Sequence, residues 1–413
     1  MSVKPRLVEP GEVDDAIRIV GAVFGNGPSP SPDYLAEVRA VTEPDRTFVV
    51  ADGGRVVGTA SAYTFDVALP GGAVPMAGIT EAGVLPTHRR RGMLSSLIAA
   101  LEDHARERGE PLAGLTASEA TIYRRFGYGV ATRFHSLTID ARRVAHLPDA
   151  EAGIADPAAV RLVTEDEAAT QLPAVWDRHW RRTPGEVSRN PAWWRMLALD
   201  VPHQRGGASG RYVAVHETGG DADGFVVYRL TPEWGHAGAR FDLRIDGLAA
   251  ASPAVEAALV RYALSVDLVA TVSWLVAPVD GTLRWQVADA RAVQVVAERD
   301  GLWLRPLDVA ACLSARRYAA EGGLVIGVVD AARPDVGGTF RLDAGPDGAA
   351  CSRTDREPEV VVRLAELGSL LLGGVRWAVL RDAGLIEERA PGAVDRADGL
   401  FRTGRAPWCA TDF

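Results

Sequence analysis

The spacing of apolar and polar positions changes repeatedly over residues 1–145, which indicates alternating helices and strands. Apolar residues recur every three or four positions over 13–24 and from Leu94 to Ala105, the spacing of helices with one apolar face. Short apolar runs between Gly, Pro and Asp turns predict strands over 47–51, 55–65, 75–85, 112–116 and 134–139. We expect an α/β module with 134–139 as its closing strand.

Two further modules follow along the chain. Residues 146–160 are rich in Ala, Asp and Pro and are interpreted as a linker. Beyond it the order strand, turn, helix recurs, with a strand over 240–248 and a helix over 254–266. Residues from about 161 to 300 are therefore interpreted as a degenerate repeat of the first module. After residue 300 strands and helices are mixed as in an α+β module.

One turn carries the strongest chemical signal. It reads Pro86-Thr87-His88-Arg89-Arg90-Arg91-Gly92 and leads directly into the helix from Met93. Arginines at a helix start are unfavourable by about 0.3–1 kcal/mol each, because the dipole is positive there. A bound anion reverses that sign, so the turn predicts a site for a bridged phosphate group, although a solvated helix start is the plain alternative. The corresponding turn of the second module, 249–253, has neither a basic residue nor a glycine.

Composition narrows the class of protein without identifying it. The 413 residues carry a formal charge of −9, which argues against nucleic acid as the main partner. Cys312, Cys351 and Cys409 are far apart and lack metal-ligand spacing, so we expect no metal and reduced thiols in a cytoplasmic setting. The N-terminus has no apolar signal-peptide segment, and no run of about 18 apolar residues predicts a membrane span.

The Arg89-x-x-Gly92 turn between strand and helix resembles the pyrophosphate loop of the GNAT acetyltransferase superfamily. Together with Ala117-Ser118-Glu119-x-x-Ile122-Tyr123-x-x-Phe126-Gly127-Tyr128-Gly129, the string at 300–305 and an acid-Phe end, it is similar to the enhanced intracellular survival (Eis) branch of aminoglycoside and lysine acetyltransferases. The resemblance covers the whole chain. It implies a catalytic GNAT domain over 1–150, a degenerate GNAT-like domain over 151–300, and a sterol-carrier-protein-like α+β domain over 301–413.

The resemblance also implies an activity and its residues. The activity is transfer of an acetyl group from acetyl-CoA, without a metal, to a primary amine of an aminoglycoside-like or lysine-like molecule by direct attack in a ternary complex. A homohexamer and a part in antibiotic resistance are implied as well. Tyr123 matches the general acid, and Phe413 matches the residue whose terminal carboxylate is the base. Cofactor contacts are implied for Ala82, Gly83, Val84, Arg89, Arg90, Arg91, Gly92, Met93, Leu94, Ser95, Ser118 and Glu119.

The residue types suit that chemistry. An alkylammonium with a pKa near 10.4 must lose a proton before it attacks, and a tyrosine hydroxyl with a pKa near 10 can protonate a departing thiolate. Glu81, on the strand before the turn, is a rival base, with an ion pair to an arginine as its structural alternative. Tyr123 as a core residue and Phe413 as a docked end without chemistry are the plain alternatives. The loop 25–28 carries no acid, which argues against a polycationic substrate.

Two functions of another class remain open from the sequence. The chain could be a non-catalytic acyl-CoA-binding or lipid-binding protein with the C-terminal module as the binder, or it could sequester a drug without modifying it. Release of a thiol from acetyl-CoA with a panel of amines separates these functions from catalysis.

Overall fold

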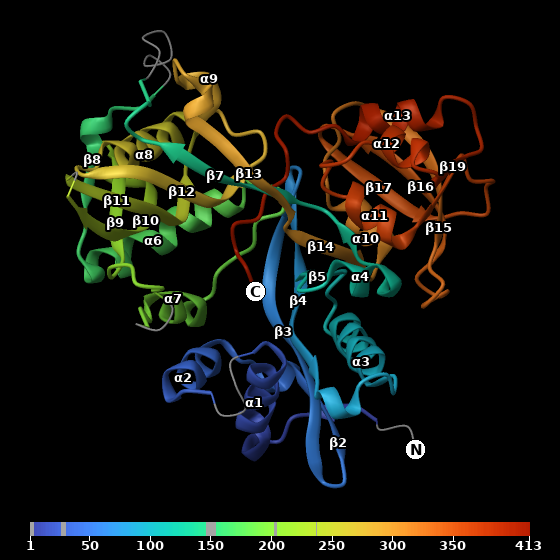
Figure 1. Cartoon of the computed structure of the whole chain (residues 1–413). Coiled ribbons are helices and arrows are strands. Elements are labelled where there is room, and N and C mark those ends of the chain that lie inside the picture. The colour runs from blue at the N-terminus through green and yellow to red at the C-terminus, as the bar shows by residue number, and fades with distance from the viewer. Residues whose placement is uncertain (1–3, 26–29, 146–153, 202–204, 237) are drawn as a thin grey trace. The chain divides into compact units, whose positions relative to one another are not determined.

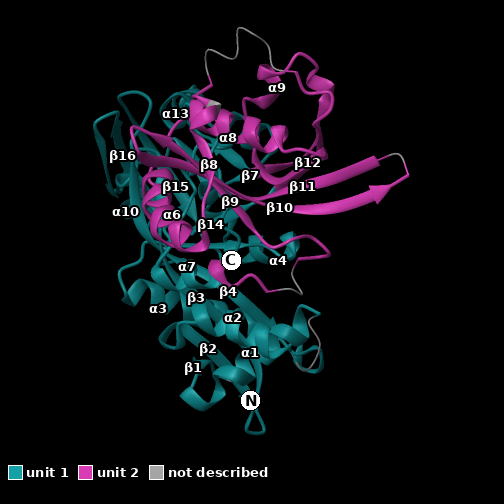
Figure 2. Ribbon diagram, turned by 90° about the vertical axis from the view of Figure 1, so that its left-hand side faces the viewer, with its two compact units in different colours: residues 1–132, 183–196, 300–413 teal, residues 133–182, 197–299 magenta. Residues whose placement is uncertain are grey.

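The computed structural model of the chain (Figure 1) describes residues 4–25, 30–145, 154–201, 205–236 and 238–413. The chain divides into two compact units (Figure 2). The first unit combines residues 1–132, 183–196 and 300–413, and the second combines 133–182 and 197–299. The chain thus leaves the first unit twice and returns to it twice, and the expected linker residues 146–153 lie outside the described residues.

A mixed sheet forms the centre of the first unit. Its described strands follow the order β1-β2-β3-β4-β5-β14-β6. Their bounds are β1 (Arg6–Leu7), β2 (Thr47–Asp52), β3 (Arg55–Leu69), β4 (Gly72–Val84), β5 (Leu112–Thr116), β14 (Leu302–Pro306) and β6 (Gly129–Val130). The turn glycines expected between β2, β3 and β4 adopt positive φ at Gly53, Gly54 and Gly71, which only glycine adopts without strain. The strands predicted between residues 47 and 116 are therefore confirmed.

One expected strand belongs to the other sheet. β7 (Arg133–Asp140) pairs antiparallel with β12 (Val269–Pro278) in the second unit, so the prediction that 134–139 closes the first sheet is wrong. Its place is taken by β14, where Trp303 pairs with Leu115 on one side and with Val130 on the other. Alternation along a strand sets which of its faces is buried, but it contains no information about which sheet the strand joins.

Helices cover the first sheet. They are α1 (Val13–Val23), α2 (Pro32–Val41), α3 (Met93–Glu107), the single turn α4 (Ala120–Tyr123), and the 3-10 turns η1 (Pro10–Glu12), η2 (Pro44–Arg46), η3 (Pro86–His88) and η4 (Arg124–Phe126). α3 buries Leu97, Ile98 and Leu101 against strands β2 to β4, as its apolar spacing predicts. At 25 cal/mol per Å², each such side chain contributes about 2 kcal/mol of burial free energy.

The C-terminal part of the first unit is the expected α+β module. Its strands are β15 (Gly322–Val329), β16 (Gly338–Gly345), β17 (Gly348–Arg353), β18 (Val360–Arg363) and β19 (Ile386–Glu388), and its helices are α10 (Val309–Ser314), α11 (Leu364–Leu370), α12 (Trp377–Asp382) and α13 (Ala393–Phe401). One hydrophobic core runs from Phe65 of β3 through Leu302 to Leu367 and Trp377. The C-terminal module and the first sheet therefore share a core.

The second unit repeats the plan of the first sheet. Its described strands follow the order β13-β7-β12-β11-β10-β9-β8. The further elements are β8 (Val160–Leu162), α6 (Glu165–Trp180), β9 (Tyr212–Thr218), β10 (Asp221–Gly235), β11 (Gly238–Ala250), α8 (Pro253–Ser265), α9 (Leu283–Gln286), η7 (Ala290–Ala292) and β13 (Val293–Asp300). As in the first unit, a long antiparallel hairpin is followed by a helix and then by a strand parallel to the hairpin. Here the hairpin is β10 and β11, the helix is α8, and β12 pairs parallel with β11.

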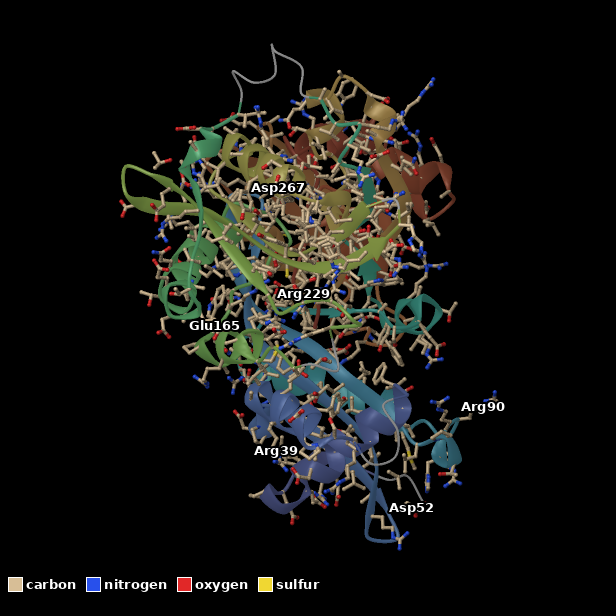
Figure 3. The ribbon with its side chains drawn as sticks, turned by 60° about the vertical axis from the view of Figure 1, so that its left-hand side comes forward. Arg39, Asp52, Arg90, Glu165, Arg229 and Asp267 are labelled. Carbon is tan, nitrogen blue, oxygen red and sulfur yellow. The ribbon has the colours of Figure 1, made fainter. Side chains whose placement is uncertain are left out.

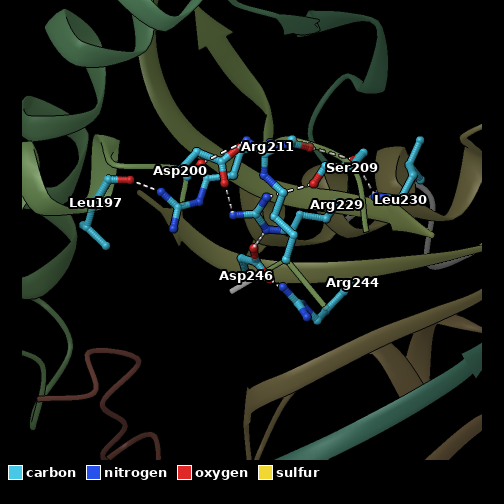
Figure 4. A network of polar contacts seen from close by, with 10 residues as sticks. Leu197, Asp200, Ser209, Arg211, Arg229, Leu230, Arg244 and Asp246 are labelled. Carbon is cyan, nitrogen blue, oxygen red and sulfur yellow. Dashed lines mark hydrogen bonds and ion pairs between the residues drawn. The ribbon is translucent and has the colours of Figure 1, made fainter. Parts of the chain in front are cut away.

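A buried arginine ties the chain after residue 197 to the second sheet (Figure 4). Arg229 of β10 is 3% exposed and donates to Asp200 (2.5 Å), to Asp246 of β11 (2.8 Å) and to the Ser209 carbonyl (2.9 Å). A buried guanidinium must be paired in this way, because burying the charge alone is costly. We interpret this network as structural.

Within the described part of the chain, none of the helices combines the length and the apolar character that a bilayer crossing needs.

Candidate functional site

The two parallel strands at the centre of the first sheet diverge. β4 and β5 pair only from Met76–Leu112 to Gly78–Gly114, although β4 runs on to Val84. A bulge in the β3–β4 ladder lies in the same stretch, and Glu81 adopts a positive φ of 52° there. The edge of β4 that carries Ala82, Gly83 and Val84 therefore lies beyond the end of its pairing with β5.

The arginine-bearing turn follows directly and begins α3. Gly92 is the N-cap residue with φ 79°, and it has no side chain that could cap the helix. The N–H groups of Met93, Leu94 and Ser95 have no acceptor within the helix, because the first turn of any helix lacks one. Arg90 also has a positive φ, 64°, which is uncommon outside glycine and occurs at functional sites. The turn therefore presents several N–H donors and a positive helix end together.

The three arginine side chains differ in their contacts. Arg89 donates from Nε to the Val84 carbonyl (3.3 Å), and Arg91 lies 3.4 Å from Asp52 at the β2–β3 turn. Arg90 is exposed and projects from the surface (Figure 3). All three residues are exposed, so their guanidinium groups remain accessible to an anion at the helix end.

A pocket of about 490 Å³ opens next to the β4–β5 divergence, and we call it the Tyr123 pocket. This volume lies within the range of small-molecule sites. Its walls come from α1, α2, β3, β4, the end of β5, α4 and the C-terminus. They are formed by Val20, Phe24, Tyr34, Tyr63, Ile79, Thr80, Glu81, Ala82, Thr116, Ala117, Ser118, Tyr123, Asp412 and Phe413.

Tyr123 is buried in this wall at the end of the short helix α4. Burial raises the pKa of its hydroxyl, whereas a hydrogen bond with Ser118 lowers the pKa. A hydrogen bond that lowers the pKa of a phenol favours its phenolate form. Gly127, with φ 85°, ends the following turn, and a Cβ there would lie 1.9 Å from Arg305. The glycine turn thus fixes the α4 region against β14.

Glu81 faces the same pocket. Burial raises the pKa of its carboxyl to about 7, opposed by the hydrogen bond that Ser61 Oγ donates over 3.1 Å. Among the described residues its partner is this hydroxyl, so the ion pair with an arginine expected from the sequence is not formed. A carboxyl with such a pKa exists in both protonation states near neutral pH, which suits proton transfer.

The last residue also reaches the Tyr123 pocket. The backbone oxygen of Phe413 accepts a hydrogen bond from Thr116 Oγ1 (2.6 Å), and its ring packs on Phe65 with centroids 4.9 Å apart. Figure 1 marks this end beside β3 and β4. Gly78 of β4 makes room, because a Cβ there would lie 2.5 Å from Phe65 and 3.1 Å from the Phe413 ring. The expectation that Phe413 packs rather than dangles is confirmed.

Some of the predicted residues line the Tyr123 pocket, and the others lie outside its wall. Glu81, Ala82, Ser118, Tyr123 and Phe413 line the pocket. Gly83 and Val84 are buried farther along β4, and Glu119 is the exposed N-cap of α4. Residues 89–92 precede α3, and residues 93–95 are its first turn. The loop at 25–28 lies mostly outside the described residues.

Sequence reasoning missed several wall residues. Tyr34, Tyr63 and Thr116 line the pocket but stand in ordinary helix and strand patterns, so no local signal marks them. Asp412 was visible only as the acid before Phe413. Among the described residues, no group of three or more His, Cys, Asp or Glu side chains has the geometry to hold a metal ion.

Comparison with known proteins assigns the family. Profiles of GNAT acetyltransferase domains match residues 4–131 and 185–305, and a sterol carrier protein domain matches 309–410. An uncharacterized N-acetyltransferase of Streptomyces coelicolor is 38% identical over 418 residues, covering 100% of both chains. The N-acetyltransferase Eis of Mycobacterium bovis is 33% identical over 378 residues, 90% of each chain. The chain belongs to the Eis family of GNAT N-acetyltransferases.

Solved structures agree with this assignment. Eis1 of Mycobacterium abscessus is 35% identical, matches 99% of this chain and 100% of its own, and superposes with a TM-score of 0.86. A GCN5-related N-acetyltransferase of Anabaena variabilis has a TM-score of 0.83 at 20% identity, which shows the fold alone. The mixed fold with two GNAT domains and a sterol-carrier-like domain, predicted from the sequence, is confirmed.

GNAT membership implies acetyl-CoA as the acetyl donor, and the residues of this Eis-family chain fit that molecule. The N–H donors from Met93 to Ser95 and the exposed arginines suit a pyrophosphate. The edge of β4 at Ala82–Val84, beyond its pairing with β5, suits the amide-bearing arm of the donor. Tyr123 and Ser118 line the pocket wall together with Ala82 of this edge.

Proposed function

We propose that this N-acetyltransferase transfers the acetyl group of acetyl-CoA to a primary amine by direct attack in a ternary complex at the Tyr123 pocket. The observation that supports the proposal is the meeting of a buried tyrosine, Tyr123, with two acidic groups, Glu81 and the Phe413 carboxylate, around one pocket. This pocket adjoins the strand edge that suits acetyl-CoA, so donor and acceptor can meet there.

In the proposed reaction the amine nitrogen attacks the thioester carbonyl carbon, the C–N bond forms and the C–S bond breaks. The Phe413 carboxylate accepts the proton that the ammonium must lose, and the Tyr123 hydroxyl protonates the leaving thiolate. The hydrogen bond with Ser118 supports this role, because it lowers the pKa of the Tyr123 hydroxyl and so favours the phenolate that remains. No covalent enzyme intermediate is needed.

Glu81 is the second candidate for the base. Its raised pKa, about 7, makes it a stronger base than an ordinary carboxylate. We assign the Phe413 carboxylate as the main base because it is held against Thr116 at the end of β5, near the α4 turn that carries Tyr123. Glu81→Gln tests the rival, since a greater loss of kcat there than on removal of Phe413 reverses the assignment.

The pocket favours a cationic acceptor. Three acidic groups, Glu81, Asp412 and the Phe413 carboxylate, lie among the aromatic rings of Phe24, Tyr34 and Tyr63. Carboxylates and aromatic faces both attract an ammonium group. These groups supply the negative charge that the sequence of the 25–28 loop lacks, so lysine-like and aminoglycoside-like amines both remain acceptors in our proposal. For the second kind, the activity would contribute to antibiotic resistance.

A thiol-release assay tests the function. Acetyl-CoA is incubated with the enzyme and a panel containing lysine, a linear diamine and an aminoglycoside, and mass spectrometry identifies the acetylated nitrogen. We expect amine-dependent thiol release with at least one of them. Tight binding of CoA with no release across a broad panel would favour the non-catalytic binding function instead.

We also propose that the chain assembles as a homohexamer, on the basis of the family resemblance. Light scattering coupled to size-exclusion chromatography measures the mass directly. A mass of a single chain at micromolar concentration would contradict the proposal.

A further inference from the structure

Residues Thr183 to Ser188 pair with the end of β3 as a short additional strand. Gly185 N–H donates to the Ala68 carbonyl (2.8 Å), and Ala68 N–H donates to the Glu186 carbonyl (2.9 Å). Val67 and Val187 form an antiparallel bridge. Ser188 N–H donates to the Asp66 carbonyl (2.8 Å), and the Ser188 hydroxyl accepts from Asp66 N–H (2.8 Å). This segment is therefore fixed along the end of β3.

The other side of the same segment holds the C-terminal tail. Trp408 N–H donates to the Pro184 carbonyl (2.9 Å). The carboxylate of Glu186 accepts from Ala410 N–H (2.7 Å) and from Thr411 Oγ1 (2.8 Å), and the Cys409 thiol lies 3.6 Å away. One carboxylate thus gathers donors from three consecutive tail residues.

Glu186 is 0% exposed, so loss of the hydrogen bonds to its carboxylate would lower the stability of the fold. A buried carboxylate without its donors is left unpaired, and charge-assisted hydrogen bonds are about twice as strong as neutral ones. Arg189 completes the cluster by donating to the Thr411 hydroxyl (2.9 Å), which in turn donates to Glu186. Burial lowers the pKa of Arg189 to about 10, with Glu186 opposing that shift, so the arginine stays charged at neutral pH.

The cluster ends two residues before Phe413. Trp193, in α7 (Pro191–Ala198) just beyond the same segment, packs on Phe65 and Tyr63 at 5.5 and 5.4 Å between centroids, and Phe65 packs on the Phe413 ring. The segment thus holds the tail through hydrogen bonds, and Trp193 packs on Phe65, the ring that contacts Phe413. Neither kind of contact uses the backbone oxygen of Phe413, which accepts from Thr116 in the pocket wall.

We infer that Glu186 is a positioning residue, which fixes residues 409–411 so that the Phe413 carboxylate lies in the Tyr123 pocket. The inference rests on the proposed function, in which that carboxylate is the base. A base must lie within hydrogen-bond reach of the proton that it takes, and a displacement of about 1 Å can lower a rate about 100-fold.

Glu186→Gln tests the inference. The amide turns one acceptor oxygen into a donor that faces the N–H or O–H groups of the tail. We expect kcat to fall between about 10- and about 100-fold, with an unchanged KM for acetyl-CoA. The matched control is Glu110→Gln, because Glu110 is also buried in the first unit but accepts from Arg46 (2.8 and 2.6 Å), not from the tail. The control should lose stability but keep its kcat.

A second readout does not depend on activity. Carboxypeptidase should release Phe413 from folded Glu186→Gln faster than from the wild type or from Glu110→Gln, as measured by intact mass. The same measurement on the untreated protein establishes that the chain ends at Phe413. If Glu186→Gln fails to fold, Thr411→Val is the milder variant, since it removes the hydroxyl between Arg189 and Glu186 and should also speed the release.

The double variant separates positioning from general destabilisation. When Phe413 is deleted, Glu186→Gln should lower kcat no further, because there is no carboxylate left to misplace. An additive loss, a tail as protected as in the wild type, or a wild-type kcat overturns the inference. If deletion of Phe413 alone leaves kcat unchanged, the proposed base is wrong, and the carboxypeptidase rate alone then decides whether Glu186 holds the tail.

Discussion

Both GNAT-like modules contain a strand, a turn and a helix in this order, but the N-terminus of the helix is capped differently in each. In the first, Gly92 precedes α3 without a capping side chain, and the N–H groups of Met93 to Ser95 stay open. In the second, Ser252 precedes α8 and its side chain accepts from Val255 N–H (3.3 Å), while Pro253 has no N–H at all. The start of α8 therefore leaves fewer N–H groups without an acceptor than the start of α3.

The charged residues at the two helix starts also differ. Arginines precede α3, whereas Glu256 lies in the first turn of α8, where it favours the helix and disfavours an anion. A helix start without a capping side chain costs stability, and such a start in the first module is consistent with the proposed pyrophosphate site. We therefore expect substitutions at the start of α3 to change the kinetic constants and those at the start of α8 to change stability alone.

The largest effect should come from Tyr123, the proposed general acid in the first module. Tyr123→Phe removes the proton donor to the thiolate, and we expect kcat to fall about 100- to about 1000-fold with little change in the KM for acetyl-CoA. Steady-state thiol release measures both constants. Tyr128→Phe is the matched control, because Tyr128 lies in the same turn but donates to the buried Glu102 (3.2 Å). A drop in kcat for both variants alike would assign Tyr123 a structural role.

The next effect concerns the arginines before α3. Arg90→Ala and Arg91→Ala should each raise the KM for acetyl-CoA about tenfold, or ~1.4 kcal/mol, with kcat nearly unchanged, because they remove charge-assisted contacts to the pyrophosphate. Arg108→Ala, at the exposed C-terminal end of the same helix, is the control. An equal KM for all three variants would place the pyrophosphate elsewhere.

A smaller effect is expected from pH. The Glu81 carboxyl, with a pKa of about 7, is mostly protonated at pH 6 and mostly charged at pH 8. Its charge attracts a cationic amine, so kcat/KM for the amine should rise over this range, and Glu81→Gln should flatten the rise. The raised pKa also means that the folded chain binds this proton more tightly than the unfolded one. Stability contributed by the group therefore falls as pH rises toward 7.

A pH profile with the same rise in Glu81→Gln would show that another group controls the step.

The smallest effect tests the capped helix of the second module. Ser252→Ala removes the side chain that accepts from Val255 N–H and should lower the free energy of unfolding by about 1 kcal/mol, measured by urea denaturation. The kinetic constants should not change. A raised KM for acetyl-CoA in this variant would contradict the view that the second module does not bind acetyl-CoA.

Local patterns in the sequence predicted the elements well but not their partners. β5 has the predicted bounds, and the arginine turn leads into a helix as expected. The exchange of β7 and β14 between the sheets was not predictable, because the pairing of Trp303 with Leu115 and Val130 depends on residues far apart in sequence. Glu186 stands in a Pro-Gly-Glu stretch typical of a turn, and only the fold turns it into a buried acceptor.

The resemblance supplied what local patterns could not. It joined Tyr123 to Phe413 across almost 300 positions of sequence, and the structure lines one pocket with both residues. Their chemical roles stay predictions. The aromatic wall at Tyr34 and Tyr63 could not be found from the sequence, because each residue also fits an ordinary amphipathic element.

The role of Phe413 as the base is decided by kcat and the CoA dissociation constant of the chain that lacks only this residue. Removing the proposed base while leaving the α3 start intact should lower kcat by at least about 100-fold and leave the dissociation constant within about twofold of the wild type. A wild-type kcat in a folded, CoA-binding protein would contradict the account.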